Sequence, residues 1–485
     1  MTLLDPTSFA GKIFNGDWIT AGDGELLVDE PATGETLTSV GAASVADALS
    51  AATSAAAAQK AWAATKPETR AAILRRAGDL WNQYSEELAT WIMRETGGIP
   101  AKAGLELHMA SEICFASAAL PEHPLGQVLP SNNDHWSFSR RRPAGVVSVI
   151  APFNFPLILS IRSVAPALAL GNAVILKPDP RTPVSGGIAL ARIFEEAGLP
   201  KGVLHVLPGG ADVGAAVVTA PEVRVVSFTG STAAGRIVGE LASKHLKRVH
   251  LELGGKNSII VLPGADVALA ASAAAFGSFL HQGQICMSTG RVIVHDSLYD
   301  EFVEILAGKA AHLPVGDPAS GQVALGPIID AKQLNRVDSI VSATVAAGAT
   351  LVAGGTYENL FYAPTVLANV TADMPAHTEE IFGPVATVYR YSTIDEAVAL
   401  ATDTEYGLSL SILGDVGLAM EIADRVPSGL VHINEQTVGD EPNIPFGGAG
   451  DSGNGSRFGG SEANIEAFTE TQWLTVRSSI APYPF

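Results

Sequence analysis

The residue best suited to covalent chemistry is Cys286, at the end of the run Phe279-Leu280-His281-Gln282-Gly283-Gln284-Ile285-Cys286. Glycine lets the backbone approach another group closely, and Gln284 supplies a side-chain amide. A cysteine in such a polar, glycine-containing turn suits a nucleophile. The alternative is a small buried hydrophobe, which is how most free cysteines behave. The chain has one other cysteine, Cys114.

Two further side chains could complete a reaction at a carbonyl group. We expect Asn154, between Phe153 and Phe155, to come directly after a strand, where its amide could donate a hydrogen bond to a developing oxyanion. Glu252 is followed by Leu253 and two glycines, and its carboxylate could act as a general base on a water molecule. The simpler interpretations are an Asx turn for Asn154 and an ordinary exposed acid for Glu252.

Three other segments could bind a nucleotide. Lys177 ends an apolar run and could contact a ribose hydroxyl or a phosphate, although a surface lysine is the commoner case. Residues 229–232 (Thr-Gly-Ser-Thr) join an expected strand to a helix N-terminus, which is suited to a pyrophosphate. Glu380, in the turn Glu379–Pro384, could hold a ribose, with Phe382 packing on the nicotinamide side; a solvated acidic turn is the alternative.

Composition limits the class of protein. With 485 residues, two or three domains are expected. The formal net charge of −20 argues against binding to nucleic acid and to anionic membranes. Two cysteines exclude a disulfide framework and fit the cytoplasm, where we expect the protein. No metal-binding motif, signal peptide or membrane span is expected.

Strands alternating with helices predict a doubly wound parallel sheet, with ligands at the carboxyl ends of its strands. A mostly helical segment covers residues 44–120. Strands are expected at residues 146–150, 173–176, 203–206, 223–228 and 249–251, and a helix over 184–197. The second half repeats this style, with strands at 258–261, 291–294, 385–391, 409–413 and 430–434. Residues 467–476 alternate in polarity and could pair with the segment 136–142.

Taken together, these motifs resemble the aldehyde dehydrogenase superfamily. The resemblance extends from about Asn15 to Val476. It rests on Pro152-Phe153-Asn154-Phe155-Pro156, Lys177-Pro178, Phe228-Thr229-Gly230-Ser231, Glu252-Leu253-Gly254-Gly255-Lys256, Gly283-Gln284-Ile285-Cys286, Glu380-Ile381-Phe382-Gly383-Pro384 and Pro445-Phe446-Gly447-Gly448.

The resemblance implies a catalytic set of Cys286, Glu252, Asn154 and Lys177. Cys286 would attack an aldehyde carbonyl as the thiolate, and Asn154 with the Cys286 N–H would hold the oxyanion. Hydride would pass to the nicotinamide, and Glu252 would activate the water that hydrolyses the thioester. A free thiol has a pKa of about 8.5, so Cys286 needs local help to ionise. The sequence does not indicate what supplies it.

The resemblance also implies a cofactor site, and we expect NAD with NADP also usable. Many NAD-preferring relatives carry Glu three residues after the lysine, whereas this chain has Pro180 followed by Arg181. A missing carboxylate removes repulsion toward a 2′-phosphate. The nucleophile motif departs too, with His281 where many members have Asn. The expected cofactor-binding residues are Lys177, Pro180, Gly209, Phe228, Gly230, Ser231, Glu252, Leu253, Gly254, Glu380 and Phe382.

Within the superfamily, residues 177–182 and 445–460 look most like the benzaldehyde and vanillin dehydrogenase branch. An apolar tunnel would suit a flat aryl aldehyde. The expected substrate-binding residues are Phe155, Arg162, Ile285, Met287 and Phe446. The alternative is an aliphatic semialdehyde dehydrogenase of the succinate semialdehyde type, in which Arg162 would bind the distal carboxylate. Glu252 disfavours a CoA-acylating enzyme, and a non-catalytic binding protein should lack Cys286 or Glu252.

The fold class implied is α/β, with two doubly wound parallel-sheet domains and a small β oligomerisation arm. Residues 1–123 and 144–253 would form the dinucleotide-binding domain, and residues 254–452 the catalytic domain. Residues 124–143 and 466–485 would form the arm, since an unpaired strand edge invites a partner. A homodimer or homotetramer is therefore expected, with a small-molecule aldehyde as substrate.

Overall fold

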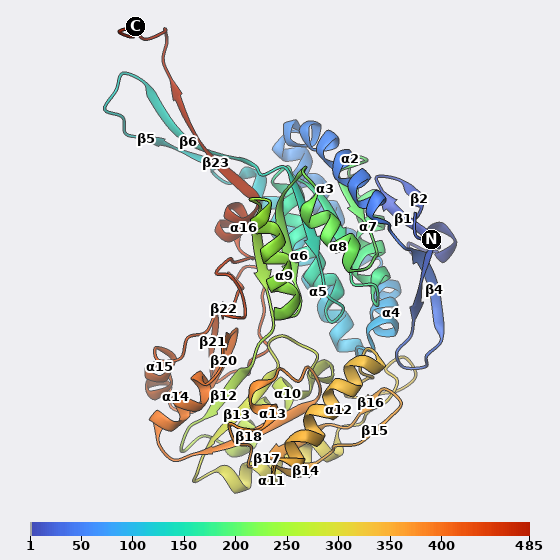
Figure 1. Ribbon diagram of the computed structural model, residues 1–485, viewed down its shortest axis with the longest axis vertical. Coiled ribbons are helices and arrows are strands. Elements are labelled where there is room, and N and C mark those ends of the chain that lie inside the picture. Colours follow the sequence, from blue (N-terminus) through green and yellow to red (C-terminus); the bar gives the residue numbers. More distant parts are fainter. Residues whose placement is uncertain (1) are drawn as a thin grey trace.

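Two seven-stranded sheets organise the chain in the computed structural model, which describes residues 2–485 (Figure 1). In the first sheet β11, β10, β7, β8 and β9 run parallel, and the hairpin β1–β2 joins antiparallel at the β9 edge. The strand order is β11 (Arg248–Glu252), β10 (Val223–Thr229), β7 (Val146–Ile150), β8 (Ala173–Lys177), β9 (Leu204–Val206), β1 (Lys12–Asn15) and β2 (Trp18–Thr20).

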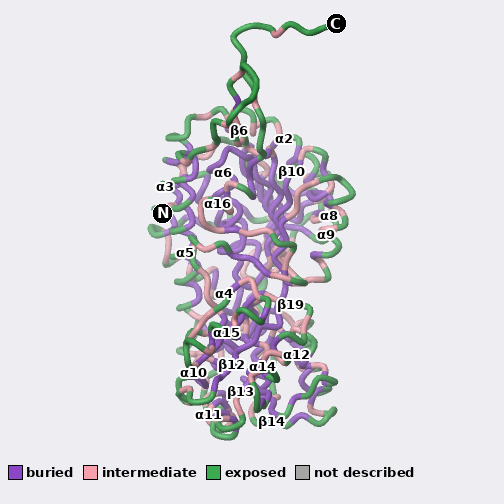
Figure 2. Tube along the Cα trace, turned by 90° about the vertical axis from the view of Figure 1, so that its left-hand side faces the viewer, coloured by how far each residue is buried: buried purple, intermediate pink, exposed green. Residues whose placement is uncertain are grey.

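Helices cover both faces of the first sheet. The alanine-rich helix α2 (Val45–Ala64) packs on one face together with α8 (Ala211–Thr219) and α9 (Thr232–Lys244). The opposite face carries α3 (Pro67–Gln83), α4 (Ser85–Thr96), α5 (Pro100–Ala119), α6 (Pro156–Ala169), α7 (Ala189–Glu196) and α16 (Ser461–Phe468). The parallel strands are buried on both faces, which explains their continuous apolar sequences (Figure 2).

The second sheet has six parallel strands and one antiparallel edge strand, β14. Its order is β14 (Thr350–Ala353), β17 (Thr365–Ala368), β18 (Val385–Tyr391), β13 (Thr289–His295), β12 (Asn257–Val261), β20 (Ser409–Leu413) and β21 (Leu430–Ile433). Its faces are covered by α10 (Val267–Phe279), α11 (Tyr299–His312), α12 (Ala331–Ala346), α14 (Ile394–Thr402) and α15 (Val416–Ala423). The predicted fold class is therefore confirmed.

A three-stranded antiparallel arm projects from the body at the end of the molecule that carries the C-terminus (Figure 1). It contains β5 (Gly126–Leu129), β6 (Trp136–Pro143) and β23 (Thr469–Val476). The predicted pairing of the C-terminal tail with residues 136–142 is confirmed, since Thr469 pairs with Pro143 and Val476 with Trp136. The tail strand starts later than predicted, because Ala467 and Phe468 complete α16.

Several other boundaries differ from the sequence-based expectation. The predicted helix over 184–197 opens with a π-helical turn, Val184–Ile188, before α7 begins. Glu252 is the last residue of β11 and does not follow the strand. Strand β17 was missed, because Thr365–Ala368 is too short to show a period. Among residues 2–485, no helix has the length and apolar character needed to cross a bilayer.

Candidate active site

The cysteine loop lies between the two sheets and is held in a strained backbone conformation. His281, Gln282 and Gly283 have φ angles of 49°, 57° and 65°, so three consecutive residues are left-handed. Only glycine adopts this region freely, and the other two residues need support from their surroundings. Gln282 provides it, because its amide nitrogen donates to the carbonyls of Gly97 at 3.0 Å and Pro327 at 2.7 Å.

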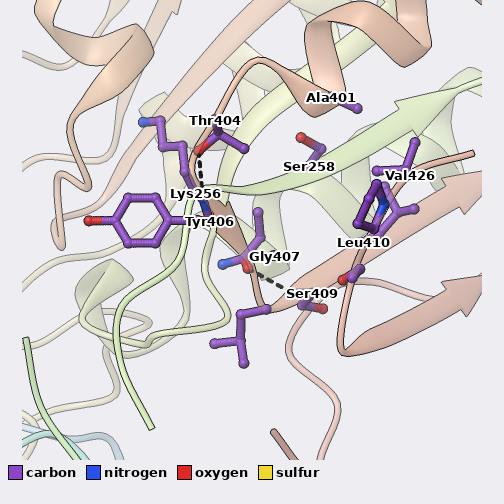
Figure 3. Close-up of a pocket in the computed structure, with 13 residues that line it drawn as sticks. Lys256, Ser258, Ala401, Thr404, Tyr406, Gly407, Ser409, Leu410 and Val426 are labelled. Atoms are coloured by element: carbon purple, nitrogen blue, oxygen red, sulfur yellow. Dashed lines mark hydrogen bonds between the residues drawn. The ribbon is translucent and has the colours of Figure 1, made fainter. Parts of the chain in front are cut away.

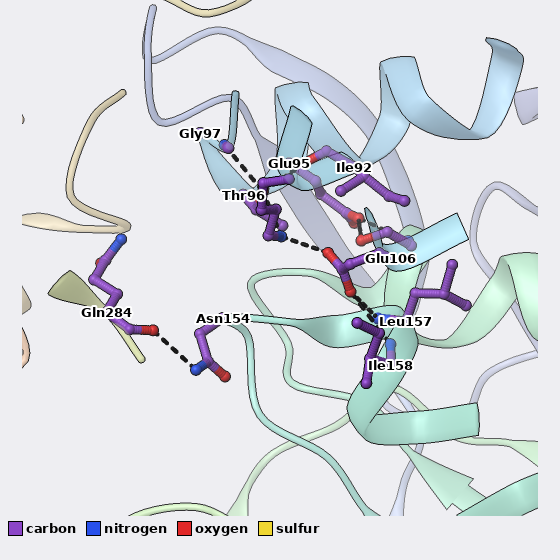
Figure 4. A network of polar contacts seen from close by, with 12 residues as sticks. Ile92, Glu95, Thr96, Gly97, Glu106, Asn154, Leu157, Ile158 and Gln284 are labelled. Atoms are coloured by element: carbon purple, nitrogen blue, oxygen red, sulfur yellow. Dashed lines mark hydrogen bonds and ion pairs between the residues drawn. The ribbon is translucent and has the colours of Figure 1, made fainter. Parts of the chain in front are cut away.

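Asn154 and the cysteine loop are in direct contact, as predicted for an oxyanion site. The Asn154 amide nitrogen donates to the Gln284 carbonyl at 2.9 Å (Figure 4). Asn154 is 3 % exposed, and its Oδ1 atom has no hydrogen-bond partner. The amide keeps one further N–H for a ligand. Asn154 does not follow the strand directly, because β7 ends at Ile150 and Asn154 lies in the turn before α6.

Cys286 is partly buried and belongs to an apolar cluster. Burial, with smaller contributions from the nearby carboxyl groups of Glu380 and Glu252, raises the pKa of the thiol to about 12, and the charge of Arg162 opposes this rise. The positive charge of Arg162 favours the thiolate form of Cys286. Asn257 fixes the loop by donating from its amide to the Cys286 carbonyl at 2.8 Å.

Glu252 is a buried acid and not the exposed acid of the simpler interpretation. It is 3 % exposed, and neither carboxyl oxygen has a hydrogen-bond partner. Burial raises its pKa well above the usual value, and Arg162 and Arg457 oppose that rise. A carboxyl group with a raised pKa and free oxygens can accept a proton from water, which is the property required of a general base.

The apolar cluster around Cys286 contains all the aromatic and aliphatic residues predicted to bind substrate. Phe155, Ile285, Met287 and Phe446 are each less than 9 % exposed. The cluster is completed by Met109, Ile158, Leu159, Leu408 and Leu430. Arg162, on α6, lies at this cluster with its guanidinium 4.5 Å from the Phe446 ring centroid. The cluster around the sulfur is thus apolar, and the charged side chain of Arg162 lies against its Phe446 wall.

Lys177 is a buried cation without an anionic partner. It is 7 % exposed at the carboxyl end of β8, and its Nζ atom donates to the Pro178 carbonyl at 3.4 Å. Burial lowers its pKa, whereas the charges of Asp179 and Asp212 raise it. The surface-lysine alternative is therefore wrong for this position. An ammonium group placed in this way can donate to hydroxyl or phosphate oxygens of a ligand.

The residues after Lys177 form an ion-pair cluster that sequence reasoning missed. Arg181 makes two hydrogen bonds to Asp179, both at 2.9 Å, and one to Asp330 at 2.8 Å. Its guanidinium also lies 4.1 Å from the centroid of the Phe153 ring. Two carboxylates thus neutralise Arg181. Pro180 lies in the turn between these charged residues and supplies no charge of its own.

The two expected phosphate turns lie where the first sheet's strands end. Gly209 is in the turn between β9 and α8. Phe228 and Gly230 lead from β10 into α9, and Ser231 caps that helix by accepting a hydrogen bond from Ala234 N–H at 3.3 Å. The free N–H groups of this helix N-terminus can bind an anion.

Glu380 and the glycine turn after β11 face each other. The Gly255 N–H donates to Glu380 Oε1 at 3.0 Å, and a side chain at Gly254 would overlap this carboxylate. Burial raises the pKa of Glu380 to about 7. Leu253, in the same turn, is buried against α9 at Gly235. Phe382 has a left-handed φ of 55° and packs edge-on against Phe153, with ring centroids 5.9 Å apart.

A small cavity lies beside this site, next to the base of β20 (Figure 3). Lys256 and Tyr406 line it on one side, and Ser409 and Leu410 line it on the other. Burial lowers the pKa of Lys256 to about 7. Cys286 does not line this cavity, so we assign no reaction to it.

A buried network supports the turn that carries Asn154, and sequence reasoning missed it (Figure 4). Glu106, on α5, accepts hydrogen bonds from the N–H groups of Leu157 at 3.0 Å and Ile158 at 3.2 Å, and it forms an ion pair with Lys102. Lys102 also lies 4.9 Å from the centroid of the Phe155 ring. Lys102 and Glu106, spaced i and i+4 on this helix, were the available signal.

Comparison with known proteins agrees with this geometry. Residues 18–474 match the sequence profile of the Aldehyde dehydrogenase family. The chain is 62 % identical to a vanillin dehydrogenase of Amycolatopsis sp., covering 100 % of both chains, and 48 % identical to a benzaldehyde dehydrogenase [NAD(+)] of Pseudomonas putida, covering 98 % of both. A salicylaldehyde dehydrogenase from Pseudomonas putida G7, crystallised with salicylaldehyde, is 35 % identical with a TM-score of 0.94, covering 98 % of this chain and 99 % of that one. The chain belongs to the aldehyde dehydrogenase family.

Proposed function

We propose that this aldehyde dehydrogenase oxidises aromatic aldehydes to carboxylic acids through a covalent intermediate on Cys286. The observation that supports it most is the set of groups around one sulfur atom. Phe155, Phe446 and their apolar neighbours surround Cys286, Asn154 contacts its loop, and the buried Glu252 lies close enough to shift its pKa. The vanillin and benzaldehyde dehydrogenases named above support the same substrate class.

Each residue has a distinct role in the proposed reaction. The Cys286 thiol first releases its proton to solvent. The thiolate sulfur then attacks the aldehyde carbon, and the resulting oxyanion accepts hydrogen bonds from the Asn154 amide and the Cys286 N–H. Loss of hydride from that carbon leaves a thioester on the sulfur. Glu252 then takes a proton from water, the hydroxide attacks the thioester carbonyl, and the acid leaves as the thiol is regenerated.

The chain's residues fit a nicotinamide dinucleotide, and the cofactor proposed is NAD. Lys177 offers a buried, unpaired ammonium group, the N-terminus of α9 offers free N–H groups, and Glu380 offers a carboxylate next to Gly254. They would hold ribose, pyrophosphate and ribose, respectively. The remaining proposed contacts are Pro180, Gly209, Phe228, Gly230, Leu253 and Phe382. A bound oxidised nicotinamide would accept the hydride.

Charge at the cofactor site favours NAD over NADP. Arg181 is the nearest candidate to bind a 2′-phosphate, but Asp179 and Asp330 already neutralise it. NADP use is therefore expected to be weaker, not absent.

The aliphatic semialdehyde alternative is less well supported. It requires Arg162 to bind a distal carboxylate, yet Arg162 already forms an ion pair with Asp440. An incoming carboxylate would compete with Asp440 for the same guanidinium.

A panel of aldehydes tests the proposal directly. NADH formation is followed with benzaldehyde, vanillin and succinic semialdehyde, using NAD and NADP, for the wild type and for Cys286→Ala. We expect the aromatic aldehydes to be oxidised fastest, and Cys286→Ala to be inactive while still binding NAD. Normal NADH formation by Cys286→Ala would refute the mechanism, and faster oxidation of succinic semialdehyde would refute the substrate class.

Three further proposals concern the domains, the assembly and the location of the protein. We propose residues 1–123 with 144–253 as the dinucleotide-binding domain and 254–452 as the catalytic domain, each built around one of the large sheets. Residues 124–143 and 466–485 contain the arm, whose exposed Trp136 and Trp473 would lie in a homodimer or homotetramer interface. A cytoplasmic location is proposed from the two free cysteines.

A further inference from the structure

Arg162 and Asp440 form an ion pair beside the apolar cluster around Cys286. Arg162 belongs to α6, and Asp440 lies in the loop between β21 and β22 (Ala449–Gly450). The Arg162 Nη2 atom donates to Asp440 Oδ2, and the guanidinium lies over the Phe446 ring. The two side chains are 8 % and 17 % exposed, so both charges are largely removed from water. Their opposite charges cancel at this wall.

Half of the Asp440 carboxylate has no hydrogen-bond donor. Its Oδ1 atom is buried and has no partner, although Oδ2 is paired with Arg162. Leaving a buried acceptor unpaired is costly, and for a charged group the cost is larger. Burial accordingly raises the pKa of Asp440, whereas Arg162 and the Glu441 backbone N–H lower it. A ligand that brings a donor to Oδ1 would remove this cost.

The ion pair lies at the wall of the apolar cluster that contains Cys286. The charges of Arg162 and Asp440 both shift the pKa values of Cys286 and Glu252. Phe446, against which Arg162 stacks, belongs to the same cluster as Cys286. A flat ring lying in this cluster with its aldehyde at the sulfur would present its other substituents to the surrounding walls, of which Arg162 and Asp440 are the charged part.

The chemistry of the pair selects among possible ring substituents. A carboxylate substituent would meet Asp440 as well as Arg162 and gain little from a neutral pair. An alkyl or unsubstituted ring would leave Oδ1 unpaired. A hydroxyl group can donate to Asp440 Oδ1. Its oxygen can accept from the Arg162 guanidinium, which has five N–H donors in all and uses only some of them for Asp440. A hydroxyl group is therefore the substituent that satisfies both members of the pair.

We propose that Asp440 and Arg162 recognise the ring hydroxyl of a hydroxylated aromatic aldehyde, with the hydroxyl donating to Asp440 Oδ1 and accepting from Arg162. This inference rests on the proposed function and adds to it a substrate class and two specificity-determining residues. The hydroxyl contact does not take part in the oxidation, so it changes which aldehydes are preferred and leaves the reaction steps unchanged.

The test compares 4-hydroxybenzaldehyde with 4-methoxybenzaldehyde, whose substituents have similar electronic effects although only the first can donate. Reactions are run at mildly acidic pH, where the phenol keeps its proton. For the wild type we expect kcat/KM to be roughly tenfold or more higher for the hydroxy compound, because a site built to bind a hydroxyl rejects the analogue that lacks it. Equal values for the two aldehydes would overturn the proposal without any variant.

Asp440→Asn provides the second measurement. In this variant the asparagine oxygen still accepts a hydrogen bond from Arg162, so the asparagine NH₂ group faces the substrate. The hydroxyl hydrogen of the substrate then meets a donor where the wild type has an acceptor. The hydroxy-to-methoxy ratio of kcat/KM is expected to fall to about one. The uncompensated Arg162 charge should also raise kcat/KM for 4-carboxybenzaldehyde. Asp395→Asn, which breaks an exposed ion pair with Arg425, is the matched control and should keep the wild-type ratio.

Different results would refute the hydroxyl-recognition proposal and the proposed function. If Asp440→Asn oxidises benzaldehyde and keeps the wild-type ratio, the recognition proposal is wrong and the proposed function stands. If the wild type oxidises succinic semialdehyde but none of the aromatic aldehydes, the proposed function itself is wrong and this inference falls with it.

Discussion

Replacing Glu106 with Gln should weaken both the fold and the turn that carries Asn154. Glutamine keeps an oxygen for the N–H groups of Leu157 and Ile158, but it removes the charge that balances Lys102. Lys102 and Glu106 side chains are 1 % and 0 % exposed, so the remaining cation would be buried without its partner. Breaking a buried pair on one side costs about 3 kcal/mol or more.

The loss of stability and the loosening of Asn154 can each be measured. With about 2–4 °C of melting temperature per kcal/mol for domains of this size, Glu106→Gln should melt roughly 6–12 °C below the wild type. A loosened Asn154 should also lower kcat. Complete loss of one oxyanion donor costs about 10²–10³ in kcat, and we expect about a tenfold loss here with little change in KM. Thermal unfolding and steady-state kinetics on the same preparation supply both values.

The double variant Lys102→Met/Glu106→Gln is the control. Because the second change removes the unpaired cation, it should recover most of the lost melting temperature. The reasoning is refuted if Glu106→Gln melts within about 1 °C of the wild type, which would place the cost far below that of breaking a buried pair. It is also refuted if the double variant is less stable than Glu106→Gln alone.

Three further predictions concern other residues. Glu252→Gln should release about one NADH per site and then stall at deacylation, measured by stopped-flow absorbance; a steady wild-type rate would contradict the assigned base. Asp179→Asn should raise kcat/KM for NADP relative to NAD, because Arg181 loses one neutralising carboxylate; an unchanged ratio would exclude Arg181 from cofactor choice. Burial lowers the pKa of His205 to about 4 from 6.5, so the unfolded chain binds the extra proton and stability falls as pH drops from about 6.5 toward 4. His205→Gln should therefore lose less melting temperature over this pH range than the wild type.

The fold was largely predictable because its parallel strands are buried on both faces. Val146–Ile150 and Ser409–Leu413 are continuous apolar or small-residue runs, and Val385–Tyr391 is interrupted by the exposed Arg390. The predicted bounds of all three agree with the strands. The start of β23 was not predictable, because the end of α16 and the strand share one alternating pattern. The left-handed turn at His281 and Gln282 was likewise invisible, since neither residue type favours that conformation.

Some residues of the candidate site were predictable from the sequence, and others were revealed only by the packing. Cys286, Asn154 and Glu252 were proposed because their motifs together resemble one family, whereas each motif alone also had a simpler structural explanation. Asp440 and Glu106 were missed, because an acid in a loop or helix is normally exposed and only packing reveals that these two are shielded. What ionises Cys286 was not predictable either, since the structure raises the pKa of the thiol and does not lower it.

The hydrogen bond from Gln282 to the Gly97 carbonyl has a mechanical consequence. Gly97 ends α4, which packs on the first sheet, whereas Gln282 lies in the loop that leads into the second. With the Asn154 contact, it makes the nucleophile loop a two-point tether between the halves of the molecule. Any hinge opening that admits or releases a dinucleotide must pull on this tether and so shift the sulfur.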